Sequence, residues 1–305
     1  MAAPQAAVGE GEPRALQVAP GVYMVQGATG EANSENLGRI GNTGFIVGDT
    51  GVVAIDTGTS YRHGRVLLEL IRRVTDKPVR LALITHTRPE FLLGAAAYQA
   101  QGVAIHMHSQ AADLMRSRCE RCLKRLQELL GADAMQSSVI IKPDHEFEQS
   151  YVIRSIGRNV RVLFYGHSSG PGDVAVLDEQ TGVLFAGGLL DNFRIPDVRD
   201  SDLAGWTGAL QQMRELPIKV IVAGHGPLGS AALIDDVDRY LAQLNARLLT
   251  LLQSGTSLLE LPNAAALPEF AHWDQYETIH RSNAAILFVR LEREKLIQHE
   301  VQKNE

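Results

Sequence analysis

Cysteine is nearly absent from this sequence, and so are long apolar runs and any excess of basic residues. The 305 residues include two cysteines, which excludes a disulfide framework of the kind that small secreted domains use. No apolar stretch approaches the roughly 18–20 residues that a membrane-spanning helix requires, so we expect no membrane span. The net charge of −6 and the pI of about 5.9 indicate that neither nucleic acid nor an acidic membrane surface is a partner.

The N-terminus lacks the basic and apolar segments of a signal peptide. Residues 1–20 are rich in Ala, Gly, Pro and Glu. We therefore predict a disordered tail over residues 1–17 and a single domain over residues 18–305, which ends in a helical extension. Two alternatives stay open for the tail: the start of a cytoplasmic protein, or the mature end of an exported protein to which a start Met was added.

Apolar periodicity predicts an alternation of strands and helices. The hydrophobic fraction of 45% and the charged fraction of 21% are ordinary for a globular domain. Period-2 and β-branched runs predict strands at 18–26, 43–47, 52–56, 79–84, 103–108, 139–142, 151–156, 160–165, 174–177, 183–186 and 219–223. Helical spacing predicts helices at 61–75, 92–100, 109–130, 202–216, 231–253 and 276–297, with Ser109 as an N-cap. Strand pairs followed by helices, twice over, predict an α/β (α+β) protein with two packed sheets and helices outside.

Three histidines follow predicted strands at points where the chain turns. His86 follows the apolar run 81–84 after one residue, Thr85, while His167 and His225 stand next to glycines. Strand ends are where ligands collect in layered α/β proteins, and imidazole suits zinc or iron. The pattern makes these three histidines candidate metal ligands, although each one is also compatible with a surface or hydrogen-bonded role.

Four blocks of sequence resemble the metallo-β-lactamase superfamily. They are Ile55-Asp56-Thr57-Gly58, the stretch from His86 to Phe91, Tyr165-Gly166-His167 with Gly172-Asp173, and Ala223-Gly224-His225-Gly226. The resemblance covers about residues 20–230. It implies a four-layer αββα sandwich and a zinc-dependent hydrolase active site at the strand ends.

Within that superfamily, the chain looks most like the quinoprotein relay system zinc metallohydrolases. The stretches that carry this likeness are Arg118-Cys119-Glu120-Arg121-Cys122, Ala134-Met135 and Arg194-Ile195-Pro196. Because that branch is exported, the resemblance implies a periplasmic location, with the cytoplasm as the alternative.

The metal-binding motif of the family has changed in this chain. Aligned on His-x-His-x-Asp-His, His86 matches the first histidine, but Arg88, Glu90 and Phe91 replace the other three ligands. A bridging Asp of the family is replaced by Gly188. Glu90 still offers carboxylate oxygens to a metal, whereas Arg, Phe and Gly side chains offer no ligand atom.

The resemblance therefore implies a reduced site of His86, Glu90, His167 and His225 that holds one ion, zinc or else iron. Asp191, three residues beyond Gly188, is a candidate replacement for the missing bridging Asp if the turn is shifted. Two-zinc hydrolysis of the conventional kind is disfavoured, because too few ligands remain.

Two functions from different classes follow. The first is a mononuclear metal-dependent hydrolase of an ester, lactone, thioester or amide, with Glu90 as ligand or general base. The second is a non-catalytic binding protein without a metal cofactor, in which Arg88 supplies the positive charge of the metal and pairs with Glu90. Its partner would be a small-molecule or anionic ligand in the cleft, or another protein.

The two cysteines, Cys119 and Cys122, form a CxxC pair inside the predicted helix 109–130. A redox pair normally stands at a helix N-terminus, which lowers the thiol pKa, and a zinc site needs further ligands. The simpler interpretation is that the two cysteines stand three residues apart on the helix by chance, and the alternative is a redox or metal role.

Overall fold

Two β-sheets packed face to face form the centre of the protein. The computed structural model describes residues 13–303, with side chains described as far as residue 297. The first sheet contains, in spatial order, β1 (Ala15–Ala19), β2 (Val22–Val25), β3 (Thr43–Val47), β4 (Val52–Ile55), β5 (Val79–Ile84), β6 (Ala104–His108) and β7 (His145–Phe147). The second contains β12 (Val220–Ala223), β11 (Val183–Gly187), β10 (Val174–Asp178), β9 (Val160–Phe164) and β8 (Tyr151–Ile153).

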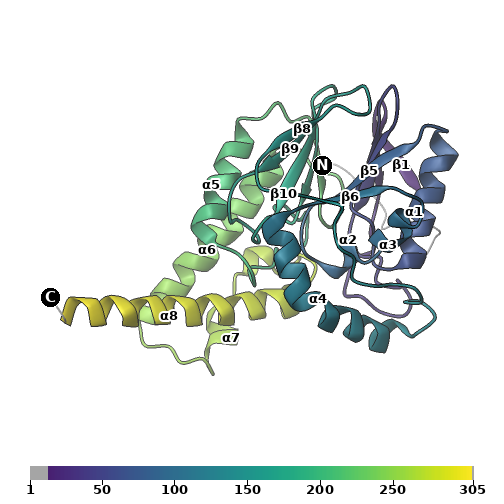
Figure 1. Ribbon diagram of the computed structural model, residues 1–305. Coiled ribbons are helices and arrows are strands. Elements are labelled where there is room, and N and C mark those ends of the chain that lie inside the picture. The colour runs from purple at the N-terminus through teal and green to yellow at the C-terminus, as the bar shows by residue number, and fades with distance from the viewer. Residues whose placement is uncertain (1–12, 304–305) are drawn as a thin grey trace.

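Helices cover the outer face of each sheet (Figure 1). The first sheet packs against α1 (Tyr61–Val74), α3 (Ala95–Gln99) and α4 (Ser109–Leu130), and the short α2 (Pro89–Leu92) follows β5. The second sheet packs against α5 (Leu203–Arg214), α6 (Ala232–Gln253) and α8 (Arg281–Lys303). The connection before α8 contains α7 (Leu261–Ala264), η1 (Pro268–Phe270) and η2 (Tyr276–His280).

Alternating side chains explain why the molecule has four layers. In β4, Val52 and Ala54 belong to the core beneath the helices, whereas Val53 and Ile55 belong to the core between the sheets. This period of two sends successive residues to opposite faces, and both faces here are apolar because both are covered. Figure 1 shows the two sheets side by side, with α5 and α6 outside one and α1 and α3 outside the other. The predicted αββα sandwich is confirmed.

Several boundaries differ from the sequence prediction. The run 18–26 is a hairpin of β1 and β2, because Gly21 turns the chain at φ +74°. Residues 139–142 are not a strand, and β7 was not predicted. The predicted helix 92–100 is broken at Leu93 and Gly94 into α2 and α3. The cap of α4 is His108 rather than Ser109, since the His108 side chain accepts from the backbone N–H of Gln110.

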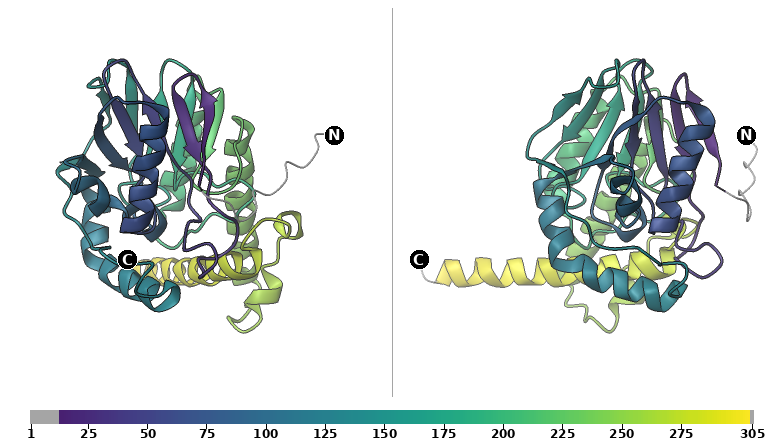
Figure 2. Two further views of the ribbon diagram at one scale, coloured as in Figure 1. Left: turned by 90° about the vertical axis from the view of Figure 1, so that its right-hand side faces the viewer. Right: turned by 45° about the vertical axis from the view of Figure 1, so that its right-hand side comes forward.

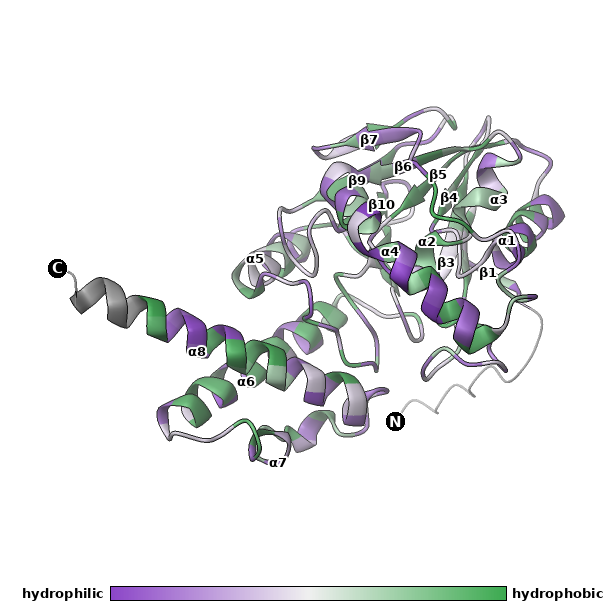
Figure 3. Cartoon of the chain, turned by 60° about the horizontal axis from the view of Figure 1, so that its bottom comes forward, coloured by the Kyte–Doolittle hydropathy of each residue, from purple (hydrophilic) through white to green (hydrophobic). Residues whose placement is uncertain are grey.

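The two ends of the chain differ in what the structure describes. Residues 1–12 lie outside the described residues, so the disordered tail stays a prediction for them, whereas residues 15–17 already belong to β1. At the other end, α8 runs beyond the body of the sandwich (Figures 1 and 2). Figure 3 shows polar and apolar residues mixed along α8, and none of the described helices is long and apolar enough to cross a membrane.

Candidate functional site

The loops after four strands meet at one edge of the sandwich. Strands β4 and β5 are parallel, as are β11 and β12, so the carboxyl ends within each pair point the same way. The two pairs of ends lie close together, because a Cβ atom at Gly188 after β11 would be 2.9 Å from the ring of His86 after β5. This edge carries the sequence blocks that predicted the site.

Asp56 and Thr85 fix the orientation of His86. The buried carboxylate of Asp56 accepts hydrogen bonds from the backbone N–H of Thr85 at 2.8 Å and from its hydroxyl at 2.9 Å. Burial raises the pKa of Asp56 to about 8. The Thr85 hydroxyl also lies 2.8 Å from Nδ1 of His86. The other ring nitrogen of His86, Nε2, is buried and has no hydrogen-bond partner among the described residues.

Phe91 fills the space beside two of the predicted metal-binding histidines. Its ring is fully buried, and its centroid lies 4.2 Å from that of His86 and 5.3 Å from that of His225. The ring also presses on Gly41, where a Cβ atom would come within 2.5 Å of it. An apolar side chain therefore occupies the space beside both histidines.

His225 is held between two carboxylates. Its Nδ1 lies 2.8 Å from Oδ1 of Asp191, and its Nε2 lies 3.3 Å from Oε1 of Glu90. Burial opposes the protonation of His225, but the charge of Asp191 and the two hydrogen bonds outweigh it and raise its pKa. Both ring nitrogens of His225 are therefore engaged by carboxylate oxygens of the protein.

Arg88 pairs with Asp197 and not with Glu90, so the predicted Arg88–Glu90 pair is wrong. The Arg88 guanidinium donates to Oδ2 of Asp197 at 2.9 Å and to its backbone carbonyl at 3.4 Å. Glu90 is instead engaged by His225, and Asp197 reaches Arg88 from the loop that precedes α5. Arg199 also approaches Asp197, at 3.5 Å, so two guanidinium groups share this carboxylate.

His167 does not join the other two histidines. It is exposed, and its Nε2 lies 2.6 Å from the backbone carbonyl of Asp200. Within residues 13–303, no three side chains of His, Cys, Asp or Glu are grouped so that they could hold one ion. The side chains as arranged therefore do not fit a zinc or iron ion, and the ligand set of His86, Glu90, His167 and His225 stays a prediction.

Asp197 gives the site a pH-dependent contribution to stability. Burial raises its pKa, but the charge of Arg88 outweighs burial and holds the value at about 2, below the ordinary 3.8. A lowered carboxyl pKa stabilises the fold above about pH 4 and loses this effect as the pH falls towards about 2. We expect Asp197→Asn to be about 2 kcal/mol less stable than wild type at pH 6, with a gap that shrinks below pH 4.

Urea unfolding at a series of pH values measures this gap. The matched control is Glu69→Gln, because Glu69 is half exposed and lies 3.8 Å from Arg65 in a surface pair. The control should show no pH-dependent gap. A gap for Asp197→Asn that stays constant down to the acid transition would contradict the assignment of this pKa to the Arg88 pair.

The sequence did not single out Asp197, and it ranked Asp191 only as a substitute ligand. Asp197 is separated from Arg88 by 109 positions, and no local pattern marks such a pair. Asn283, on α8, holds the Asp197 loop by accepting from the N–H of Val198 and donating to the carbonyl of Pro196. The one signal in the sequence is Arg88 itself, because a buried arginine requires a carboxylate partner elsewhere in the chain.

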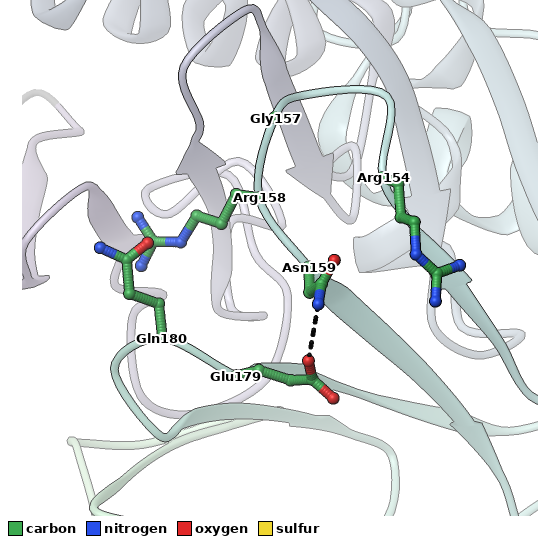
Figure 4. Close-up of a pocket in the computed structure, with 6 residues that line it drawn as sticks. All are labelled: Arg154, Gly157, Arg158, Asn159, Glu179 and Gln180. Carbon is green, nitrogen blue, oxygen red and sulfur yellow. Dashed lines mark hydrogen bonds between the residues drawn. The ribbon is translucent and has the colours of Figure 1, made fainter.

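Two surface hollows lie away from this edge. One, of about 410 Å³, is lined by Arg154, Gly157, Arg158, Asn159, Glu179 and Gln180 at the turns before β9 and β11 (Figure 4). The other is lined by Pro13, Arg14, Ala15, Leu70, Arg73 and Val74 beside α1. Neither is lined by the histidines or by Arg88, so they add nothing to the candidate site.

Comparison with known proteins agrees with this architecture. The family model described as the metallo-beta-lactamase superfamily matches residues 37–225. The linear primary-alkylsulfatase of Pseudomonas sp. (strain ATCC 19151) is 22% identical over 262 residues, which are 73% of this chain and 49% of that protein. The chain thus spans about half the length of this curated relative.

Two solved structures share the fold. A metallo-beta-lactamase from Pontibacter korlensis has a TM-score of 0.62 and 23% identity, and the match covers 75% of this chain and 99% of that one. TMB-1, whose structure addresses substrate and inhibitor binding, has a TM-score of 0.60 and 12% identity, with 76% and 98% covered. With the family model matching more than half of its residues, this chain belongs to the metallo-beta-lactamase superfamily.

Proposed function

We propose that this chain is a metal-independent member of the superfamily that binds a small anionic ligand beside Arg88. The observation that carries this proposal is the fully buried Phe91 ring, which contacts His86 and His225 in the place of a metal ligand. The salt bridge of Arg88 to Asp197 and the Glu90–His225–Asp191 cluster balance charges at this edge with protein groups alone.

Arg88 has the exposure and the hydrogen-bonding capacity that an anion needs. Its side chain is 28% exposed, compared with 14% for Glu90 and 7% for His225. A guanidinium has five N–H donors, and the hydrogen bonds described for Arg88 use two of its nitrogens on Asp197. Arg199 also approaches Asp197, so a second guanidinium group lies beside Arg88 at this carboxylate.

The curated relative indicates the class of anion. Its name describes it as acting on linear primary alkyl sulfates, and a sulfate monoester carries one negative charge on a compact oxygen-rich head. Arginine recognises such oxyanions with paired, charge-assisted hydrogen bonds. A sulfate ester or a similar oxyanion is therefore the ligand class that we propose for Arg88.

Calorimetric titration of the full chain with octyl sulfate, and with inorganic sulfate, tests the proposal. We expect binding that survives an excess of chelator, and protein that contains no stoichiometric zinc or iron by elemental analysis. No inorganic sulfate should be released from octyl sulfate during the titration. Loss of binding with the chelator, or release of sulfate, would refute a metal-independent binding role.

Removing the Arg88 charge should weaken this binding. Truncating a charge-assisted hydrogen bond typically costs about 1.5–3 kcal/mol, so we expect the double variant Arg88→Gln/Asp197→Asn to raise the Kd for octyl sulfate about 10- to 100-fold. The double substitution leaves neither partner as an unpaired buried charge. The change in Kd is measured by the same titration.

Arg199→Gln and Arg65→Gln form a matched pair of controls. Both arginines are similarly exposed, at 63% and 64%, and each approaches one carboxylate. Arg199→Gln should raise the Kd by a few-fold because its charge lies beside Arg88, while Arg65→Gln should leave it unchanged. Equal effects of the two would show that only general surface charge attracts the anion.

A second candidate function is a hydrolase with a single ion. The buried Nε2 of His86, which lacks a partner among the described residues, favours it, because a free imidazole nitrogen is a metal ligand. Stoichiometric zinc or iron that is lost in His86→Ala would establish this candidate over the first. Location in the periplasm, which the resemblance implies, stays a prediction under either function.

A further inference from the structure

The two cysteines of the chain lie one turn apart in the middle of α4. Cys119 is 1% exposed and packs in the core beneath the first sheet, whereas Cys122 is half-buried at the edge of that core. Residues three apart on a helix have Cβ atoms about 5–6 Å from each other on one face. The two residues therefore form a vicinal pair in which Cys122 is the more accessible member.

Charged groups of the candidate site surround this pair. Arg118, next to Cys119, forms an ion pair with Asp200 in the loop before α5. The same loop contributes Arg199, whose positive charge acts on Cys122, while the negative charge of Glu90 acts on it from α2. The thiol pair therefore lies where α4 borders the site.

The environment favours the thiolate at Cys122 over that at Cys119. The hydrogen bond from Cys119 lowers the pKa of Cys122 to about 6. Burial and the negative charge of Glu90 raise this pKa, and the positive charge of Arg199 lowers it. The hydrogen bond to Cys122 and burial raise the pKa of Cys119. The thiolate is the reactive form of cysteine, so Cys122, the more accessible member of the pair, is also the more nucleophilic one.

We propose that Cys122 is an oxidation site for hydroperoxides and that Cys119 is its resolving thiol. The Cys122 thiolate attacks one oxygen of the hydroperoxide and the O–O bond breaks, so that Cys122 becomes a sulfenic acid and the leaving alkoxide or hydroxide takes a proton from solvent to give an alcohol or water. Cys119 then attacks the sulfenic sulfur, its proton leaves with the hydroxyl as water, and an intrachain disulfide forms. Each step balances with the hydroperoxide as the oxidant.

Helix geometry makes this disulfide readily reversible. Bridged cysteines have Cβ atoms about 3.5–4.5 Å apart, which is closer than the separation of about 5–6 Å on a regular helix. Formation of the bond therefore distorts the middle of α4, and strained disulfides are more easily reduced than relaxed ones. The distortion acts next to the Arg118–Asp200 ion pair, which couples the oxidation state of α4 to the loop that carries Asp197.

Peroxide treatment of the full chain, followed by alkylation and intact mass analysis, tests the pair. We expect wild type to lose two hydrogens and both alkylatable thiols, and to recover them with dithiothreitol. In Cys119→Ser, with dimedone present during oxidation, Cys122 should carry the dimedone adduct of a sulfenic acid. In Cys122→Ser, Cys119 should remain alkylatable after denaturation and react at least about tenfold more slowly with peroxide, because it is buried and protonated.

Three outcomes would overturn the inference. If both thiols of the wild-type protein stay alkylatable after peroxide treatment, Cys122 is not a reactive site. If Cys119→Ser gives no dimedone adduct, Cys122 does not form a sulfenic acid. If the only disulfide found joins two chains, Cys119 is not the resolving thiol. Because mass is the readout in each case, the result does not depend on metal content or on anion binding.

Discussion

Replacing Arg88 by His, Glu90 by Asp and Phe91 by His is expected to convert a chain without stoichiometric zinc into one that binds zinc tightly. The substitutions return ligand side chains at positions 88 and 91 to the loop after β5 and exchange the Glu90 carboxylate for the shorter one of the family pattern. Even outer-shell losses change metal affinity by about 10–100-fold each, so restoring ligands themselves should raise zinc affinity by at least about 1,000-fold. Elemental analysis and competition with a chromophoric chelator measure the gain.

Two physical effects contribute to this expectation. The first is charge: a guanidinium about 4 Å from a divalent ion, at an effective dielectric constant of about 20, costs on the order of 8 kcal/mol. The second is space, since the Phe91 ring lies against both His86 and His225. Removing only one of these obstacles should therefore restore little affinity.

Gly188→Asp alone is the matched control for the triple variant. It adds the carboxylate of the family pattern but keeps Arg88 and Phe91, and its Cβ would meet the His86 ring and the Asp173 carboxylate at 2.9 Å. We expect no zinc uptake from it. Wild-type protein with a full equivalent of zinc, or a folded triple variant without zinc, would contradict this account of the site.

The second large effect is expected from Asp178→Ala, which should destabilise the fold by about 3–5 kcal/mol. The Asp178 side chain is fully buried and pairs with Arg158, whose side chain is 6% exposed. Arg158 also donates to the carbonyls of Pro20 and Val47 in the first sheet, at 3.1 and 3.2 Å. Truncating Asp178 thus leaves a buried cation without a counter-charge at the point where the two sheets are tied together.

Urea unfolding of Asp178→Ala and Glu179→Ala separates burial from charge. Glu179 is the next residue, is 40% exposed and forms a pair with Arg161 at 3.7 Å, so its loss should cost under about 1 kcal/mol. The double variant Arg158→Met/Asp178→Leu, which replaces both ions by apolar groups, should recover most of the lost stability. Similar costs for Asp178→Ala and Glu179→Ala would show that the buried pair is unimportant.

Much of the fold followed from periodicity and turn residues. The runs 43–47 and 79–84 are strands with the predicted bounds. The helix predicted to start at residue 202 is α5, and Asp202 is its N-cap. The predicted bounds were wrong where a single residue redirects the chain. Gly21, for example, turns the run predicted as one strand into a hairpin. Local patterns specify elements well because alternation and capping are local in their physics.

The candidate site was predictable only in part. The blocks around Asp56, His86 and His225 do meet at one edge, because strands in parallel pairs end there. The partners of Arg88 and His225 were not predictable with the same reliability: Asp197 and Asp191 come from a loop without periodicity. His167 stands in a family block and yet is exposed and bonded to a carbonyl.

The sequence by itself determined the layers of the sandwich and the superfamily blocks, and it predicted the loss of ligand groups at Arg88, Phe91 and Gly188. Those features depend on residue type and short spacing, which the chain displays directly. Only the tertiary structure decided that Phe91 lies against two histidines and that Arg88 pairs with Asp197. Such pairings join residues distant in sequence, and packing selects them from many chemically equivalent partners.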